Sequence, residues 1–307
     1  MRNTIILFLF CALAWSSLAQ QLPQYSQWTS HQLALNPAHA GIKKCIDVHA
    51  LYRNQWVGMS DSPTSGFFTA SIPLKTKQNK LFTPRHGLAL RFEGDKAGMF
   101  NTNRLNLGYA AHFNFTTETR LSLGVFAGVF NFGFDHSRAT TLVPDEAVMR
   151  EVSIVRPDAH FGAWWNGKNY YLGLMVNQLL PMNLGVGSSQ FRFHSAINGG
   201  FKWAVNDDFA ILPHAILRMP IVSKMNADVL VNFDYRNQVN LGVGYRTTDA
   251  VLLIAGFKIN QQFSLNYSFD LNVSGLSHVS KHTHEIGISF ITCKPERKGT
   301  NNCALFE

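Results

Sequence analysis

The sequence predicts an all-β protein, a transmembrane antiparallel β-barrel of about 14 strands with a short N-terminal leader segment. Between about residues 226 and 291, apolar and polar residues alternate, and short polar turns separate the segments. Leu265, Tyr267, Phe269 and Leu271 are apolar while the residues between them are polar, so the two faces of this strand differ. The chain also opens with an export signal, and no later apolar run is long enough for a membrane helix.

Residues 1–19 are predicted to be a signal peptide. Arg2 supplies a basic start, residues 5–14 are apolar, and Ser17-Leu18-Ala19 places small residues at a cleavage site. The apolar run falls short of the roughly 20 residues that a membrane-spanning helix needs. The mature chain is therefore expected to begin at Gln20.

Residues 20–44 are predicted to form a leader or plug segment, because they are polar, interrupted by proline and weakly periodic. Tyr25 and Trp28 supply apolar anchors, Asn36-Pro37 favours a turn, and Gly41 can adopt positive φ. The segment is expected either to fold back into the barrel lumen or to dock at its periplasmic rim. Its aromatic residues argue against a disordered tether.

Residues 45–291 are predicted to form the outer-membrane barrel. An even strand number and segments of roughly 9 to 11 residues are typical of single-chain outer-membrane barrels. The longest insertion, about 133–155, contains a proline and early acidic residues at 144–150, which favour a short helix. The strands are expected near residues 46–54, 66–74, 85–93, 103–114, 120–132, 156–166, 169–177, 191–203, 208–217, 226–234, 238–247, 250–259, 262–270 and 282–291.

Composition agrees with a barrel and argues against nucleic-acid binding. Only 15% of the 307 residues are charged and 12% are aromatic, with 24 Phe and 23 Gly. A barrel with a polar lumen and an apolar outer face has this balance. The formal charge is +8, but the basic residues are scattered and form no arginine-rich stripe.

Three cysteines remain after signal removal: Cys45, Cys293 and Cys303. Export permits a disulfide, and an odd number leaves one thiol over. Cys293 and Cys303 would close a loop in the C-terminal tail, residues 292–307. Alternatively, the pairing of the first and last strands would bring Cys45 beside Cys293.

The sequence predicts no enzyme and no cofactor, because it lacks catalytic and metal-binding motifs. The sequence contains no nucleophile elbow, phosphate loop or His-Glu-x-x-His motif. His282 and His284 would share one strand face and Glu285 the other, which disfavours a metal site. Asp234, Arg236, Arg246 and Asp270 occupy polar-face positions and are candidates for a lumenal charge network.

Both ends of the predicted mature chain carry recognisable motifs. Pro23-Gln24-Tyr25-Ser26-Gln27-Trp28, Leu35-Asn36-Pro37-Ala38-His39-Ala40-Gly41 and Tyr52-Arg53-Asn54-Gln55-Trp56 resemble the opening of the PorP/SprF family, outer-membrane proteins of the type IX secretion system of Bacteroidetes. Gly242-Val243-Gly244-Tyr245-Arg246, Tyr267-Ser268-Phe269-Asp270 and His284-Glu285-Ile286 look like further marks of the family. His39 and Phe269 depart from its usual tyrosines. The candidates for partner contacts are Tyr25, Trp28, Asn36, Pro37, Gly41, Tyr52, Arg53, Gln55 and Trp56.

The resemblance implies a nonenzymatic component of type IX secretion in the cell outer membrane. The implied partners are cargo proteins with C-terminal sorting domains, periplasmic ring and lipoprotein components, and outer-membrane lipid, but no nucleic acid. Secretion or surface display of adhesins and enzymes, and gliding motility, are the implied roles. A porin-like or small-molecule transport barrel is the alternative, which an open lumen would favour.

Overall fold

The computed structural model describes residues 23–75, 83–135, 152–183, 190–191, 193–220, 225–247, 249–275 and 280–293. The predicted signal peptide, the helix predicted at 144–150, Cys303 and the tail beyond residue 293 lie outside these ranges.

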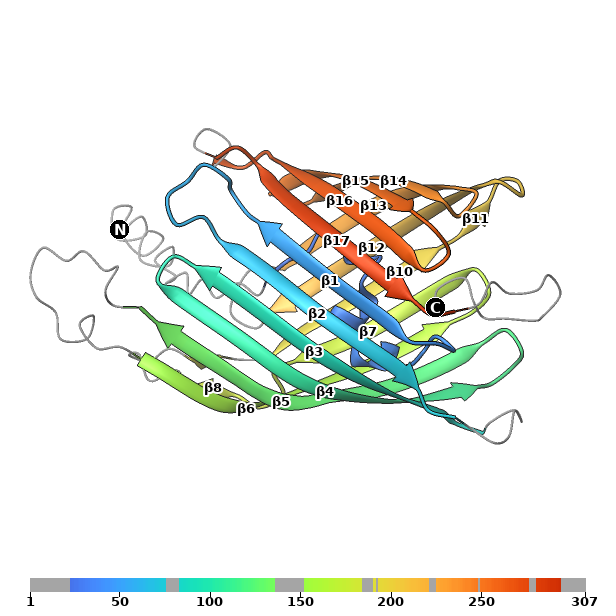
Figure 1. Cartoon of the computed structure of the whole chain (residues 1–307), viewed down its shortest axis with the longest axis horizontal. Helices are drawn as coiled ribbons and strands as arrows, with labels where there is room; N and C mark the ends of the chain where they lie inside the picture. The colour runs from blue at the N-terminus through green and yellow to red at the C-terminus, as the bar shows by residue number, and fades with distance from the viewer. Residues whose placement is uncertain are drawn as a thin grey trace, which may run out of the picture.

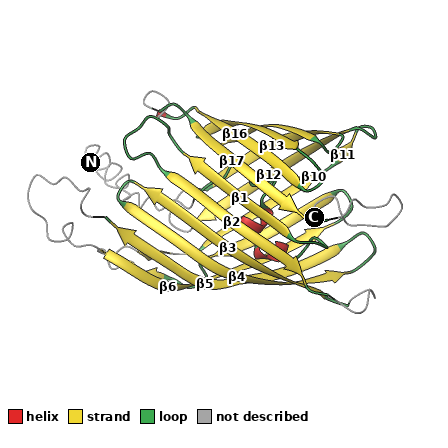
Figure 2. Cartoon of the chain, viewed as in Figure 1, coloured by secondary structure: helices red, strands yellow, loops and turns green. Residues whose placement is uncertain are grey.

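The strands form one closed antiparallel barrel (Figures 1 and 2). Closure follows because β1 pairs with β17, while β10 pairs with both β7 and β12. Counting β10 and the short β11 that follows it as one position gives 14 strand positions around the barrel. The strands are β1 (Asp47–Asn54), β2 (Thr64–Pro73), β3 (Arg85–Ala97), β4 (Phe100–Asn114), β5 (Arg120–Phe134), β6 (Val152–Asn166), β7 (Tyr170–Asn177), β10 (His194–Phe201), β11 (Trp203–Ala204), β12 (Phe209–Pro220), β13 (Asn226–Tyr235), β14 (Val239–Arg246), β15 (Ala250–Lys258), β16 (Phe263–Asn272) and β17 (Thr283–Ile291).

The predicted barrel and its strand number are confirmed, but the strands from β3 to β6 are longer than predicted. They have 13, 15, 15 and 15 residues. β6 pairs with β5 along its whole length but with β7 only from Phe161 to Asn166. Pro157 lies in the part of β6 without a β7 ladder, a position that tolerates a residue lacking an N–H. Beyond β7, β8 (Met182–Asn183) and β9 (Gln190–Phe191) pair only with each other.

The two faces of the barrel wall have opposite polarity. On β16, Leu265, Tyr267 and Leu271 are exposed on the outside, whereas Ser268 and Asp270 are buried inside. The same inversion holds around the barrel, where large apolar side chains are exposed and arginines and carboxylates are buried. A wall that is apolar outside and polar inside is what a lipid bilayer requires.

The connections differ between the two ends of the barrel. Short turns at 167–169, 236–238 and 259–262 lie on the side where β1 begins and β17 ends. The opposite side carries the two longest connections, at 135–151 and 178–193. Outer-membrane barrels have short periplasmic turns and longer extracellular loops. The end where β1 begins and β17 ends is therefore the periplasmic one.

Two short helices precede the barrel and lie inside it (Figure 2). They are the α-helix α2 (Gln32–Leu35) and the 3₁₀ helix η1 (Pro37–His39). The Asn36 side chain accepts a hydrogen bond from the Ala38 amide and so caps η1, with Pro37 at its first position. No helix among the described residues is long and apolar enough to cross a membrane.

Candidate functional site

The leader, residues 23–42, occupies the barrel lumen. Tyr25 is 3% exposed, Trp28 is 1% exposed, and Asn36 and Ala38 are fully buried. The 3₁₀ helix η1 packs against β4, β5 and β6, and α2 packs against β2. The segment therefore contacts strands that are distant in sequence from it, and it fills the lumen as a plug.

A buried charge network lies on the barrel wall beside the start of the leader. Arg53 binds both Glu285 and Asp270, with 2.9 Å between Arg53 Nη1 and Asp270 Oδ2. Arg246 lies between Asp228 and Asp270, at 3.2 Å from each. Arg218 binds Asp228 through two hydrogen bonds of 2.9 and 3.0 Å. The charge network consists of three arginines and three carboxylates: Arg53, Arg218, Arg246, Asp228, Asp270 and Glu285.

This charge balance matters because all of these side chains except Arg218 are at most 2% exposed. Burying an unpaired charge is strongly unfavourable, whereas a hydrogen-bonded pair recovers much of the desolvation cost. Asp249, which is 30% exposed, adds a 3.5 Å contact to Arg246 at the edge of the network. Removal of any one of these side chains would therefore leave an uncompensated buried charge on its partner.

The leader adds hydrogen bonds to this network. The backbone N–H groups of Ser26 and Gln27 donate to the two carboxylate oxygens of Glu285, at 2.7 and 3.1 Å. Ser26 Oγ donates to Asp270 at 2.7 Å and accepts from Arg246 Nη2 at 3.0 Å. Hydrogen bonds to charged groups are stronger than neutral ones. The charge network is therefore also the strongest polar attachment of the leader.

A second polar attachment joins the leader to β3. Tyr25 OH donates to Glu93 at 3.1 Å, and Arg91 Nη1 donates to the backbone carbonyl of Ala34 at 3.0 Å. Burial, with Glu93 beside the ring, raises the pKa of Tyr25 well above its usual value. The Tyr25 hydroxyl therefore stays protonated and remains a donor.

Glycines on the inner wall let the leader backbone approach closely. Asn36 Nδ2 donates to the carbonyls of Ala163 and Leu174, at 3.1 and 3.2 Å. A Cβ on the neighbouring Gly162 would lie 1.9 Å from Asn36 Oδ1, so no other residue fits there without displacing the leader. Gly87 faces the leader turn in the same way, because its Cβ would lie 2.5 Å from the Gly41 Cα. Gly41 itself has a φ of +65°, as its predicted turn requires.

Aromatic packing holds the rest of the leader. Trp28 packs in a buried cluster with Met175, Ala196 and Ile216. The His39 ring lies edge-on to Trp164, with 4.1 Å between ring centroids. Burial lowers the pKa of His39 to about 3, so its docked form is neutral at ordinary pH. Burial also lowers the pKa of His31.

A disulfide fixes the C-terminal end of the leader. Of the two pairings that the sequence allows, the structure contains Cys45–Cys293. It joins Cys45, two residues before β1, to Cys293, two residues after β17, with 5.1 Å between the two Cα atoms. The leader is thus tethered at the seam where the barrel closes.

The structure separates the candidate residues into three groups. Tyr25, Trp28, Asn36, Pro37 and Gly41 belong to the leader, and Arg53 faces it from the wall. Tyr52, the neighbour of Arg53 on β1, points outward and is 53% exposed. Gln55 and Trp56 lie in the connection after β1, where Trp56 has a φ of +55° and its backbone N–H donates to Thr283 Oγ1 at 3.2 Å.

The structure brings together two of the four candidates for a lumenal network. Arg246 and Asp270 are in contact, but Asp234 and Arg236 take no part. Arg236 lies beyond the end of β13, in the turn before β14, and pairs with Asp208 where both side chains are more than half exposed. Asp234 accepts a hydrogen bond from the Asn237 backbone N–H in that turn. The prediction is wrong for these two residues because polar-face alternation does not show how far a strand extends before it leaves the membrane.

Several residues of the charge network and of the attachment at β3 carry no recognisable motif. Asp228, Arg218, Arg91 and Glu93 were missed by the sequence reasoning, although each is a charged residue within a predicted strand or at its end. Charge at an inward position of a membrane strand is the signal that identifies such residues. Glu285, which the sequence presented as an unfavourable metal ligand and as part of a family motif, is the main acceptor for the leader. Among the described residues, no group of three His, Cys, Asp or Glu side chains is arranged to hold a metal ion.

Comparisons with known proteins agree with the barrel. A family model described as type IX secretion system membrane protein PorP/SprF matches residues 17–290. The CymD monoaromatic hydrocarbon channel has a similar fold, with a TM-score of 0.53 and 10% identity over 91% of this chain and 95% of that chain. The translocator domain of autotransporter NalP from Neisseria meningitidis matches with a TM-score of 0.46 and 11% identity, over 86% of this chain and 92% of that one. No match is found among curated proteins.

Proposed function

Because the chain belongs to the PorP/SprF family of type IX secretion system membrane proteins, we propose that its plugged barrel engages secreted cargo or the secretion machinery in the outer membrane. Its family and fold are those of a secretion or transport membrane protein rather than of an enzyme class. The proposed partners are cargo proteins with C-terminal sorting domains and periplasmic ring or lipoprotein components. The proposed result is secretion or surface display of proteins such as adhesins and exported enzymes, including those used in gliding.

The filled lumen is the observation that supports this proposal over a porin. Small-solute diffusion needs a continuous aqueous channel, whereas here the buried leader occupies the lumen and is held by charged hydrogen bonds and a disulfide. A barrel that keeps its lumen closed is suited to acting as a platform in the membrane. Residues of the loops and rims, such as Trp56, are then the proposed points of contact with partners.

Deletion of the gene in the native bacterium, with quantitative proteomics of surface, medium and periplasmic fractions, tests the proposal. Loss from the surface or medium of one adhesin, or of a small set of proteins sharing a C-terminal sorting domain, would support it and identify the cargo. Unchanged export with reduced uptake of a solute would instead indicate a transport barrel.

Single-channel recording on the purified full chain separates the same two functions in vitro. A plugged barrel is expected to give no steady conductance in a planar bilayer. A stable open conductance in the intact, disulfide-bonded protein would favour the porin-like alternative.

A further inference from the structure

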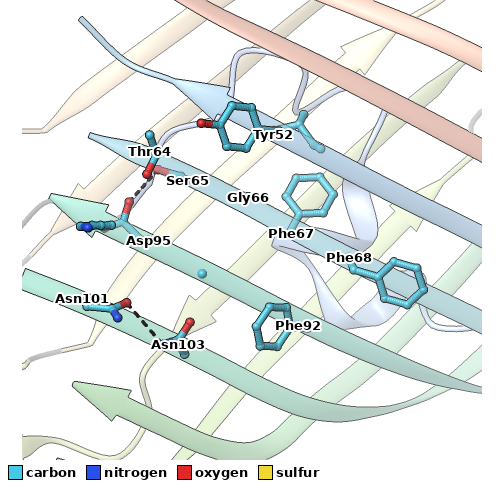
Figure 3. A pocket seen from close by; sticks show the side chains of 13 residues that line it. Tyr52, Thr64, Ser65, Gly66, Phe67, Phe68, Phe92, Asp95, Asn101 and Asn103 are labelled. Carbon is cyan, nitrogen blue, oxygen red and sulfur yellow. Dashed lines mark hydrogen bonds between the residues drawn. The ribbon is translucent and has the colours of Figure 1, made fainter. Parts of the chain in front are cut away.

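The outer face of the barrel has a pocket of about 410 Å³ over β1, β2, β3 and β4 (Figure 3). Gly66 of β2 and Gly94 of β3 are directly paired across the ladder, so two adjacent outward positions carry no side chain. Tyr52 borders the gap on the β1 side and Asn103 borders it on the β4 side. A neighbouring outward pair, Phe68 and Phe92, forms its apolar wall.

The pocket lies where the apolar band of the outer wall ends. Along β4, the outward residues Leu105, Leu107 and Tyr109 are 46%, 69% and 42% exposed, which indicates contact with hydrocarbon. The next outward residues toward the extracellular end, Asn103 and Asn101, are polar. The boundary between acyl chains and headgroups therefore crosses the pocket, with Phe68 and Phe92 on its hydrocarbon side.

The polar end of the pocket carries a cation. Lys96 is exposed there, beside Asn101 and Asn103, and no ion pair to it occurs among the described side chains. The carboxylate of its neighbour Asp95 accepts a hydrogen bond from Ser65 Oγ at 2.6 Å, and Ser65 faces the barrel interior. The pocket thus changes from aromatic to cationic along the direction from the membrane core to the extracellular surface.

We propose that this pocket binds one anionic phosphorylated lipid of the extracellular leaflet. An acyl chain lies in the gap over Gly66 and Gly94 against Phe68 and Phe92, and the phosphate lies at Lys96. The order of the groups supports a lipid, because a lipid has its chain and its phosphate in the same order along the membrane normal. The carboxamides of Asn101 and Asn103 supply further donors to the phosphate.

Native mass spectrometry of the delipidated full chain tests this assignment, with monophosphoryl lipid A as the probe and phosphatidylcholine as the zwitterionic comparison. The wild type should retain one lipid A per barrel in preference to phosphatidylcholine. Lys96→Gln should weaken lipid A retention about fivefold, the expected effect of one lysine near a charged membrane surface. Gly94→Leu should also weaken lipid A retention, because the leucine side chain would fill the gap. The barrel should tolerate this change, because the nearest atom to a Cβ there is the flexible amide oxygen of Asn103, at 3.2 Å.

Lys168→Gln is the matched control, because Lys168 is an exposed lysine in a turn at the periplasmic end. It should retain lipid A as the wild type does. Heat-modifiable migration on a gel checks that each variant is folded, and Lys96→Gln alone suffices if Gly94→Leu does not fold. Retention by Lys96→Gln within twofold of the wild type would overturn the proposal, as would cross-linking of Lys96 in cells to a protein and not to lipid.

Discussion

Replacing Glu285 with glutamine should release the leader while leaving the barrel closed. The change keeps the shape of the side chain but removes one negative charge from a network of three arginines and three carboxylates. Arg53 would then face a neutral amide, and one of the two leader N–H groups that donate to Glu285 would face an NH₂ group. The substitution should weaken leader docking more than barrel closure, because the backbone N–H groups of Ser26 and Gln27 both donate to this one carboxylate.

The expected magnitude follows from those contacts. Hydrogen bonds to charged groups are each worth about 1.5–3 kcal/mol, and breaking one partner of a buried ion pair costs about 3–5 kcal/mol. If about 3 kcal/mol of this loss falls on leader docking, the undocked population rises about 150-fold. The double change Arg53→Gln with Glu285→Gln should be less damaging than Glu285→Gln alone, because it restores equal numbers of opposite charges.

Limited proteolysis of the purified full chain measures the undocked population, with cleavage within residues 23–42 as the readout and heat-modifiable gel migration as the check on the barrel. Asp208→Asn is the control, because the Asp208–Arg236 pair is more than half exposed and does not touch the leader. It should leave cleavage unchanged. Wild-type protection of the leader in Glu285→Gln would refute the assignment of the charge network as the attachment.

Three further perturbations address the other attachments. Gly162→Val should expose the leader to protease, because even a Cβ there would lie 1.9 Å from Asn36 Oδ1, whereas Gly275→Val, with no atom within 4 Å of its Cβ position, should not. Cys45→Ser should remove the cross-linked peptide from a nonreducing map and lower the stability of the barrel by about 2–5 kcal/mol in chemical denaturation. The docked leader should weaken as pH falls from about 6.5 toward 3, because released His39 gains a proton there while docked His39, with its pKa near 3, does not. At pH 5, protonation of released His39 should weaken leader docking by about 2 kcal/mol relative to neutral pH. A His39→Phe variant whose protease protection has the same pH profile as the wild type would contradict this assignment.

The barrel could be predicted from the sequence because the bilayer imposes a strong local rule. Each spanning strand must alternate apolar and polar residues, and this pattern can be recognised in each strand without knowing which strands it pairs with. The limits of β3 to β6 could not be predicted in the same way. Beyond the membrane an extended strand no longer needs an apolar outer face, so a residue such as Asn101, outside the predicted strand, continues β4 without the alternation.

The leader site was less predictable because its contacts join residues that are far apart in sequence. Ser26 and Glu285 are separated by 259 positions, and Arg53 reaches Glu285 only because β1 pairs with β17. The motifs indicated which residues take part, but only the register of the closing strands brings their charges together. Firm docking of the leader therefore requires a closed barrel, since the carboxylate that holds Ser26 and Gln27 meets its arginine across the β1–β17 pairing. An unclosed barrel has no complete binding site for its own plug, which couples plugging of the lumen to correct assembly of the wall.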